Sequence, residues 1–412
     1  MTKTEWKPSR LDELGFVGRG KSRHRPRNDS RLYGGPYPFI QTAEIMDADP
    51  YITSYSQTYT ELGLQQSKLW PPNTLCMTIA GANTAETAIL KFEACFPDSI
   101  IGFIPDEKKA DLHFVKYSLD LMKHKFLAVT RGATQDNLSL DKLLSFPLAT
   151  PPLFIQRRIG GILSAYDGLI ENNQRRIKIL EEMARSLYRE WFVHFRFPGH
   201  DKVKMVPSPL GPIPQGWEVA KVGSVFKTLL GGTPSRAKAE YWQNGIVPWI
   251  KSGKVNELRI IEPSELITEL ALERSAAKMM PCGTTVIAIT GATLGQVSYL
   301  EIDTAANQSV VGVTDEAGMF SEWLYLMFKE RIHEIILHAS GGAQQHINKE
   351  IVSDVQALIP PAKFADQFKY LVEPMFRQLA TLMFKTQNLL CTRDMLLPRL
   401  LSGQIDISKR SA

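Results

Sequence analysis

The chain has 412 residues, which is enough for two or three domains. Its 44% hydrophobic and 22% charged residues are the balance of a folded globular protein, and no apolar run approaches the roughly 18 residues of a membrane span. Residues 1–14 are polar and lack the apolar core of a secretory signal. We therefore expect a cytoplasmic protein that contacts no membrane.

The net charge of +5 is concentrated near the N-terminus. Between residues 19 and 31 there is one acid, Asp29, among six cations: Arg19, Lys21, Arg23, Arg25, Arg27 and Arg31. This surplus equals that of the whole chain, so the remainder is electrically balanced. A cationic segment beside a neutral body indicates contact with a polyanion, although a solvated loop would have the same composition.

The cysteines and histidines do not predict a metal site. The four cysteines are widely separated, which excludes a disulfide framework or a Cys-based zinc site as a first interpretation, and we expect buried reduced thiols at Cys76, Cys95, Cys282 and Cys391. The eight histidines contain no H-E-x-x-H arrangement.

The chain contains a long internal repeat, at a shift of about 210 residues. Residues 38–45 correspond to 248–255, 75–82 to 285–292, 99–102 to 309–312, and 132–135 to 342–345. Each copy begins with short strand-like runs, among them 74–80 and 284–290, separated by Gly, Pro and Asn. Each then continues from a Pro-Pro pair, at 151–152 and 360–361, into a long helical pattern. The expected order is therefore a first globular part (1–150), a helix (151–196), a linker (197–215), a second globular part (216–360) and a second helix (361–412).

Both long helices carry apolar residues at heptad spacing, which predicts coiled-coil packing of one helix against the other. In the first helix the heptad positions are Ile159, Tyr166, Asn173, Leu180 and Leu187. Further apolar residues lie nearby, at Ile162, Leu169 and Met183 three residues further on and at Leu163, Ile170 and Ile177. In the second helix they are Phe368, Met375, Leu382, Leu389 and Leu396. We expect an α+β fold in which two similar mixed globular domains are separated by two long antiparallel helices that form a coiled coil.

Over nearly its full length, the chain resembles the specificity (S) subunit of Type I restriction-modification enzymes. The residues that carry the resemblance are Gly216-Trp217-Glu218, the string from Gly231 to Ser235, the run from Gly342 to Lys349, and the helix ends 187–192 and 396–403. Copy one departs from the pattern, because Gly18 to Ser22 stands where copy two has Gly-Gly-Thr-Pro-Ser.

The resemblance implies a non-catalytic subunit with two target-recognition domains, each reading one half of a bipartite double-stranded DNA site. It also implies that the helices dock two modification (methyltransferase) subunits and that two restriction subunits join the complex. S-adenosylmethionine, ATP and Mg would lie on those partner subunits, and this chain would hold no cofactor or metal and no catalytic residue.

Lys and Arg contact phosphates, and Arg, Lys, Asn and Gln read base edges, so these residue types in loops are the candidate DNA contacts. In copy one they are Arg19, Lys21, Arg23, Arg25, Arg27, Gln135 and Asn137. In copy two they are Arg236, Lys238, Lys251, Lys254, Gln344, Gln345, His346, Asn348 and Lys349. Trp242 and Trp249 are expected in the core.

Three other interpretations remain open. The chain could serve a different methylase or restriction effector, or it could be a coiled-coil scaffold that binds only proteins. Residues 15–22 also match the G-x-x-x-x-G-K-S pattern of a phosphate-binding loop. We do not expect a nucleotide site there, because no buried strand precedes the match and Pro26 interrupts any helix after it.

Overall fold

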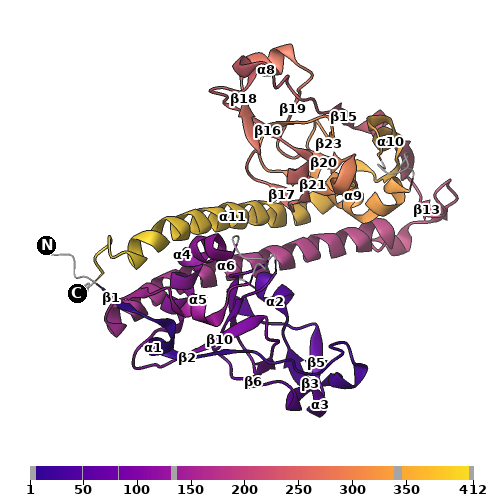
Figure 1. Ribbon diagram of the computed structural model, residues 1–412. Helices are drawn as coiled ribbons and strands as arrows, with labels where there is room; N and C mark the ends of the chain where they lie inside the picture. The colour runs from indigo at the N-terminus through magenta and orange to yellow at the C-terminus, as the bar shows by residue number, and fades with distance from the viewer. Residues whose placement is uncertain (1–5, 49, 82, 131–136, 338–345, 408–412) are drawn as a thin grey trace, which may run out of the picture. The chain divides into compact units, whose positions relative to one another are not determined.

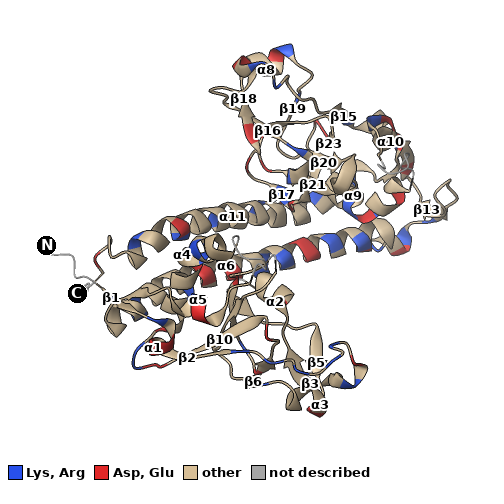
Figure 2. Cartoon of the chain, in the orientation of Figure 1, with Lys and Arg blue, Asp and Glu red and all other residues tan. Residues whose placement is uncertain are grey.

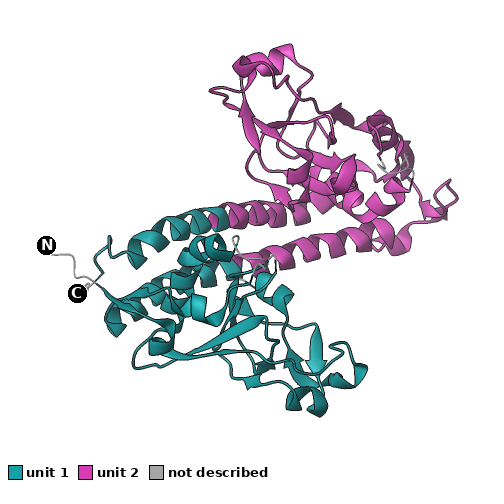
Figure 3. Cartoon of the chain, viewed as in Figure 1, with its two compact units in different colours: residues 1–172, 386–412 teal, residues 173–385 magenta. Residues whose placement is uncertain are grey.

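The computed structural model describes residues 6–48, 50–81, 83–130, 137–337 and 346–407. The chain forms two compact units (Figure 3). Unit 1 comprises residues 1–172 and 386–412, and unit 2 comprises residues 173–385. Each unit therefore contains one globular part together with part of both long helices, α6 (Leu153–Tyr188) and α11 (Ala362–Leu401) (Figure 1).

The globular part of unit 1 contains two main sheets. The five-stranded sheet has the order β2-β10-β7-β8-β4, with bounds Gly15–Arg19, Ile100–Pro105, Leu75–Thr78, Thr87–Leu90 and Tyr51–Ile52. The four-stranded sheet has the order β5-β3-β9-β6, with bounds Gln57–Tyr59, Tyr33–Phe39, Ala94–Cys95 and Leu69–Trp70. A further pair joins β1 (Lys7–Ser9) to β11 (Leu148–Thr150). The helices are α1 (Leu11–Leu14), α2 (Thr42–Met46), α3 (Glu61–Gln65), α4 (Leu112–Thr130) and α5 (Leu140–Leu144).

Unit 2 repeats this topology strand for strand. Its five-stranded sheet, β15-β23-β20-β21-β17, has bounds Lys227–Leu230, Val310–Thr314, Thr285–Ala288, Val297–Leu300 and Arg259–Ile260. Its four-stranded sheet, β18-β16-β22-β19, has bounds Glu265–Ile267, Val247–Ile250, Thr304–Ala306 and Met279–Met280. β14 (Glu218–Lys221) pairs with β24 (Gln356–Ile359). The helices are α7 (Val222–Val225), α8 (Glu269–Arg274), α9 (Ser321–Ile336) and α10 (Lys349–Asp354).

The repeat extends to the pairing of single residues. Phe39 lies beside Cys95 in a parallel pair, and Trp249 lies beside Ala305 in the equivalent parallel pair. Glycine recurs where a strand packs closely under a large side chain: a Cβ on Gly102 would lie 2.6 Å from Trp70, and one on Gly312 would lie 2.7 Å from the sulfur of Met280. The predicted duplication is thus confirmed, and the expected strands at 74–80 and 284–290 are β7 and β20.

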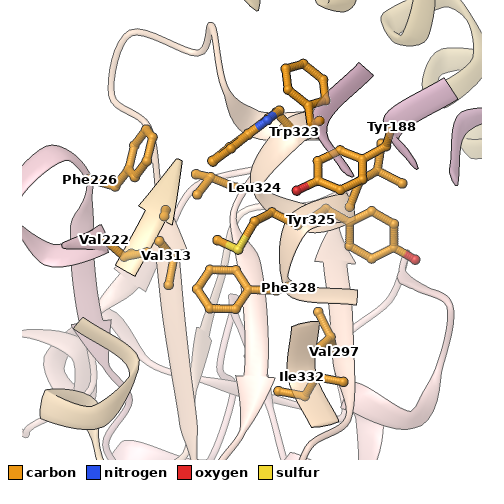
Figure 4. Close-up of a cluster of buried hydrophobic side chains, with 14 of the residues drawn as sticks. Tyr188, Val222, Phe226, Val297, Val313, Trp323, Leu324, Tyr325, Phe328 and Ile332 are labelled. Carbon is orange, nitrogen blue, oxygen red and sulfur yellow. The ribbon is translucent and has the colours of Figure 1, made fainter. Parts of the chain in front are cut away.

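Each unit has its own core. In unit 1, α4 supplies Phe114, Val115 and Phe126 to a cluster with the sheet residues Ile89 and Ile101. In unit 2, the side chains of α9 gather with residues of β23, α7 and the following turn (Figure 4); the cluster includes Val222, Phe226, Val313, Trp323, Leu324 and Phe328. β7 and β20 are buried at every residue because both faces of their sheets are covered: alternate side chains of each strand enter two different apolar clusters.

The two long helices pack antiparallel within each unit. In unit 1, Ile155, Ile159 and Leu163 near the start of α6 share a core cluster with Leu400 and Leu401 at the end of α11. In unit 2, the end of α6 meets the start of α11, where the ring centroids of Tyr188 and Phe368 are 6.4 Å apart. The predicted antiparallel helix pair is confirmed for these contacts.

The predicted helix-pairing residues are all buried or half-buried: Ile159, Tyr166, Asn173, Leu180, Leu187, Phe368, Met375, Leu382, Leu389 and Leu396. The heptad pattern is nevertheless wrong at two of the positions three residues further on, because Leu169 and Met183 are exposed. The apolar positions Leu163, Ile170 and Ile177 are buried or half-buried as expected, and Asp167, Glu181 and Ala184 are buried as well. These positions also recur in steps of seven residues, and the buried face is wider than a single seam because each helix packs on a globular part as well as on the other helix.

The boundaries of the helical and linker segments differ from those expected. After α6 the chain makes one π-helical turn, Arg189–Val193, and α11 ends at Leu401 because Gly403 adopts a left-handed conformation with φ of 68°. The expected linker is structured: β12 (Met205–Val206) pairs with β13 (Ile213–Pro214), and Phe197 stacks on Trp217. Among the described residues, no helix is long and apolar enough to cross a membrane.

Candidate nucleic-acid interface

The cationic segment of unit 1 follows β2 and is held by backbone hydrogen bonds. Gly20 N donates to Ile100 O at 2.9 Å, and Lys21 N donates to Phe96 O at 3.0 Å. The side-chain carbonyl of Gln66 then accepts from Arg23 N at 2.6 Å and from His24 N at 3.0 Å. These bonds fix the path of the segment, while its six Lys and Arg side chains remain exposed.

The six cations differ in how far their charge is compensated. Arg31 pairs with Asp29 at 2.7 Å and Arg27 pairs with Asp98 at 3.0 Å. Arg19 and Arg25 donate only to carbonyl oxygens, those of Asp98, Ser22 and His24. Within the described residues, Lys21 and Arg23 make no ion pair. We call Arg19, Lys21, Arg23 and Arg25 the unpaired cations; together they present four charges to solvent.

An aromatic and cationic cluster lies beside this segment, and sequence reasoning missed it. Lys68 Nζ lies 4.2 Å from the ring centroid of Phe16 and 3.7 Å from that of Trp70. Burial, and then the charge of Lys21, lowers the pKa of the Lys68 ammonium. Phe16 is 52% exposed on β2. The sequence offered one signal for this cluster: Phe16 is an apolar residue on the strand that leads directly into the cationic segment.

The equivalent backbone in unit 2 carries compensated charges. Gly231 N and Gly232 N donate to Val310 O and Ala306 O, the counterparts of the bonds made by Gly20 and Lys21. Further along, Arg236 stacks on Trp242, with 3.4 Å from the guanidinium carbon to the ring centroid, and pairs with Glu265 at 2.6 Å.

Glu265 also pairs with Lys251, so one carboxylate serves two predicted DNA contacts. Hydrogen bonds from Arg236 and then from Lys251 lower the pKa of Glu265 to about 2. Lys254 lies between Glu257 at 2.8 Å and Glu262 at 3.0 Å, and only 14% of its side chain is exposed. Lys254 is therefore poorly placed to reach a phosphate without breaking these pairs.

Three of the remaining candidates in unit 2, His346, Asn348 and Lys349, lie just before or at the start of α10. His346 forms an isolated antiparallel bridge with Thr290, as Asn137 does with Ala80 in unit 1. Asn348 caps α10, since its side-chain oxygen accepts from Ile351 N at 2.8 Å, and Lys349 is the first residue of that helix. Lys238 donates to the hydroxyl of Tyr241 at 3.1 Å. Gln135, Gln344 and Gln345 lie outside the described residues.

An apolar groove of about 520 Å³ runs along the helix pair in unit 2. It is lined by Ile179, Met183 and Leu187 of α6 and by Met375 of α11, with Glu182 and Glu190 among its polar neighbours. Ile179 and Met183 are about half exposed. Lys, Arg, Asp and Glu are interspersed along both helices (Figure 2). Exposed apolar patches of this kind are typical of surfaces that bind protein partners.

The predictions for the cysteines and tryptophans are confirmed only in part. Cys76 and Cys95 are buried, but the expectation of burial is wrong for Cys282 and Cys391, which are exposed. Trp249 is in the core as expected, and Trp242 is half-buried beside it. The match to a phosphate-binding loop forms strand β2 and then the cationic segment, with no helix directly after it. Within the described parts of the chain, no group of three His, Cys, Asp or Glu residues could hold a metal ion.

These features describe a protein of two equivalent modules on paired helices, with a different charged surface on each module. The model of the family "Type I restriction modification DNA specificity domain" matches residues 3–182 and 214–368, and the chain belongs to this family. It is thus a specificity subunit of the Type I restriction-modification kind, as its sequence indicates.

The chain is similar to individual members of the family over most of its length. It is 23% identical to the Type I restriction enzyme MjaIX specificity subunit of Methanocaldococcus jannaschii, covering 98% of this chain and 94% of that one. It is also 23% identical to the HindI specificity subunit of Haemophilus influenzae, over 68% of this chain and 74% of that protein. The crystal structure of a Type I S subunit from M. genitalium shares its fold, with a TM-score of 0.64, 15% identity and 97% coverage of both chains.

Proposed function

We propose that each globular domain of this specificity subunit reads one half of a bipartite double-stranded DNA target in the cytoplasm. The observation that carries the proposal is the strand-for-strand repetition of one topology with unlike polar residues at equivalent positions. Lys21 stands where unit 2 has Gly232, and it opens a cationic segment that unit 2 lacks. Two domains that share a fold but carry different polar side chains are suited to recognising two different half-sites.

We further propose that the chain is non-catalytic and that two methyltransferase subunits, with two restriction subunits in the full complex, supply the chemistry. S-adenosylmethionine, ATP and Mg would then bind those subunits. The similarity to specificity subunits supports this division of labour. The apolar groove at Ile179 and Met183 is the surface that we assign to a methyltransferase subunit.

The DNA-reading proposal is tested by sequencing the methylome of a host that lacks this chain and then expresses it with its methyltransferase subunit. The expected result is methylated adenine in one new asymmetric motif with two specified halves and an unspecified spacer. The chain or the methyltransferase expressed alone should add no methylation. A motif of contiguous bases, or the same motif without this chain, would contradict the proposal.

Docking is tested with Met183→Asp together with Ile179→Asp, which place charge in the groove. We expect co-purification of the methyltransferase subunit to fall at least about ten-fold, because desolvating a carboxylate at an apolar contact is costly. Ile246→Asp is the matched control, since Ile246 is 70% exposed on the globular part of unit 2 and lies outside the groove. Equal co-purification of both variants would remove the groove from the interface.

A further inference from the structure

Arg259 is a fully buried cation at the base of the second globular domain. It opens the edge strand β17 and lies beside Tyr299 in the register of β21. Its side chain has no exposed surface, and its Nη1 donates to Glu301 Oε1 at 2.8 Å. A charge removed from water in this way requires opposite charges held at fixed positions.

The second carboxylate beside Arg259 comes from the long helix α6. Arg259 Nη2 lies 3.6 Å from Glu181 Oε2, and the other oxygen of Glu181 accepts a hydrogen bond from the hydroxyl of Tyr325 at 2.8 Å. Tyr325 belongs to α9 of the same domain. The sheet and α9 are therefore both tied to one carboxylate of α6.

The other long helix closes the cluster with an aromatic ring. The guanidinium carbon of Arg259 lies 3.9 Å from the ring centroid of Phe376, which belongs to α11. The rings of Tyr299 and Tyr325 lie 5.3 Å and 5.8 Å from that of Phe376. One buried side chain thus contacts the sheet, α9, α6 and α11 at once.

Such a cluster fixes where α6 lies against the domain, because moving α6 away from Arg259 would leave buried charges without partners. Unit 1 is built differently at this place: Tyr51 stands at the position of Arg259, Lys91 stands at that of Glu301, and Lys91 Nζ lies over the Tyr51 ring at 3.6 Å.

We propose that Arg259 and Glu181 are positioning residues that hold the second recognition domain at one orientation on the helix pair, and so determine which spacer length between the two half-sites is accepted. This inference rests on the proposed function. It assigns spacer discrimination to a contact between a domain and a helix, not to the identity of any base-reading side chain.

The test uses the full chain in complex with its methyltransferase subunits and DNA duplexes whose spacer is native, or longer or shorter by one base pair. The main variant is Arg259→Met with Glu181→Leu, which replaces the charge pair between the sheet and α6 by apolar groups of similar size and leaves Glu301 as the remaining acid of the cluster. We expect the ratio of methylation rates on native and altered spacers to fall on the order of ten-fold, with the preferred bases of each half-site unchanged. Lys221→Met, which breaks the exposed pair with Asp354, is the control and should keep the wild-type ratio.

A second variant covers the case in which the double variant does not fold. Tyr325→Phe removes the hydroxyl that donates to Glu181 at 2.8 Å and to Leu258 O at 3.5 Å, and it should lower the ratio by about three-fold. A folded double variant with the wild-type ratio, or an unchanged ratio in Tyr325→Phe when the double variant is unfolded, would overturn the inference. Failure of the wild-type complex to methylate any bipartite duplex would instead overturn the proposed function.

Discussion

The two units share one topology but use their arginines differently where the globular part meets the long helices. In unit 1, Asp167 of α6 accepts from the hydroxyl of Tyr117 in α4 and pairs with Arg393 of α11 at 2.7 Å. In unit 2, the buried acid of α6 meets an arginine of the sheet. Arg393 therefore ties helix to helix, whereas Arg259 ties domain to helix. The two copies of a duplicated fold can therefore keep the same strand order while their buried ion pairs join different elements.

The largest expected effect is the loss of stability on removing each arginine. Arg259→Ala leaves Glu181 and Glu301 buried without a cation, and we expect the free energy of unfolding to fall by about 3–5 kcal/mol. Arg393→Ala leaves a single buried acid, still hydrogen-bonded to Tyr117, and the loss should be about 1–3 kcal/mol. Urea unfolding of both variants measures the difference. Equal losses of stability in the two variants would show that the two arginines do not differ in how many buried acids depend on them.

The loss in Arg259→Ala should also depend on pH. Burial already raises the pKa of Glu301 above its ordinary value, despite the neighbouring arginine. A carboxyl whose folded pKa exceeds its unfolded pKa destabilises the fold at high pH, and this penalty decreases as pH falls through the folded pKa. The variant should consequently lose less stability at pH 5 than at pH 8. The opposite trend would show that Glu301 is not the group left uncompensated.

The second comparison concerns the cations of the two proposed DNA-reading surfaces. Changing all four unpaired cations of unit 1 to Ala should weaken DNA binding and reduce the slope of log affinity against log salt by up to about 3–4. In unit 2, changing the predicted contacts Arg236, Lys251 and Lys254 to Ala should reduce the slope less for each cation removed, because each is paired with a carboxylate. Titrations at several salt concentrations measure both slopes. An equal reduction for each cation removed would mean that phosphates replace the carboxylates when DNA binds.

The duplication and the long helices could be predicted because both rest on local sequence. The apolar runs of β7 and β20 and the Pro-Pro pairs before α6 and α11 recur at nearly constant spacing. The partners of the cations could not be predicted. Arg27 meets Asp98 and Arg236 meets Glu265 only through the folded chain, and composition alone does not distinguish a paired surface arginine from an unpaired one.

The buried face of the helices was predicted only in part, for a related reason. A heptad pattern describes two helices that contact each other alone. Asp167 and Glu181 are polar, so a search for apolar positions passes over them, yet both are buried where the helix meets a globular part. Their partners come from α4, α11, β17 and α9, which no local pattern connects.

A smaller effect is expected at the caps of the equivalent helices α5 and α10. Ser139 accepts from Lys142 N at 3.2 Å, and Asn348 accepts from Ile351 N at 2.8 Å. Asn348→Ala should lower the free energy of unfolding by about 1 kcal/mol, while Asn348→Ser should keep most of the stability. If Asn348 acts only as a cap, DNA affinity will follow stability in both variants. A loss of affinity in the stable Ser variant would restore Asn348 as a direct DNA contact.

The smallest effect concerns the charge pair that distinguishes the surface of unit 2. Arg236 and Lys251 lower the pKa of Glu265 to about 2, so this carboxylate contributes stability above its unfolded pKa, near 4.5, and loses it as pH falls toward 2. The contribution is modest because solvent screens a partly exposed pair. In an NMR titration, Arg236→Met should move the Glu265 midpoint upward toward its ordinary value. Saturating DNA should also raise the Glu265 midpoint if a phosphate displaces Glu265 from Arg236. If the midpoint does not change when DNA is bound, Arg236 remains paired with Glu265 and does not contact a phosphate.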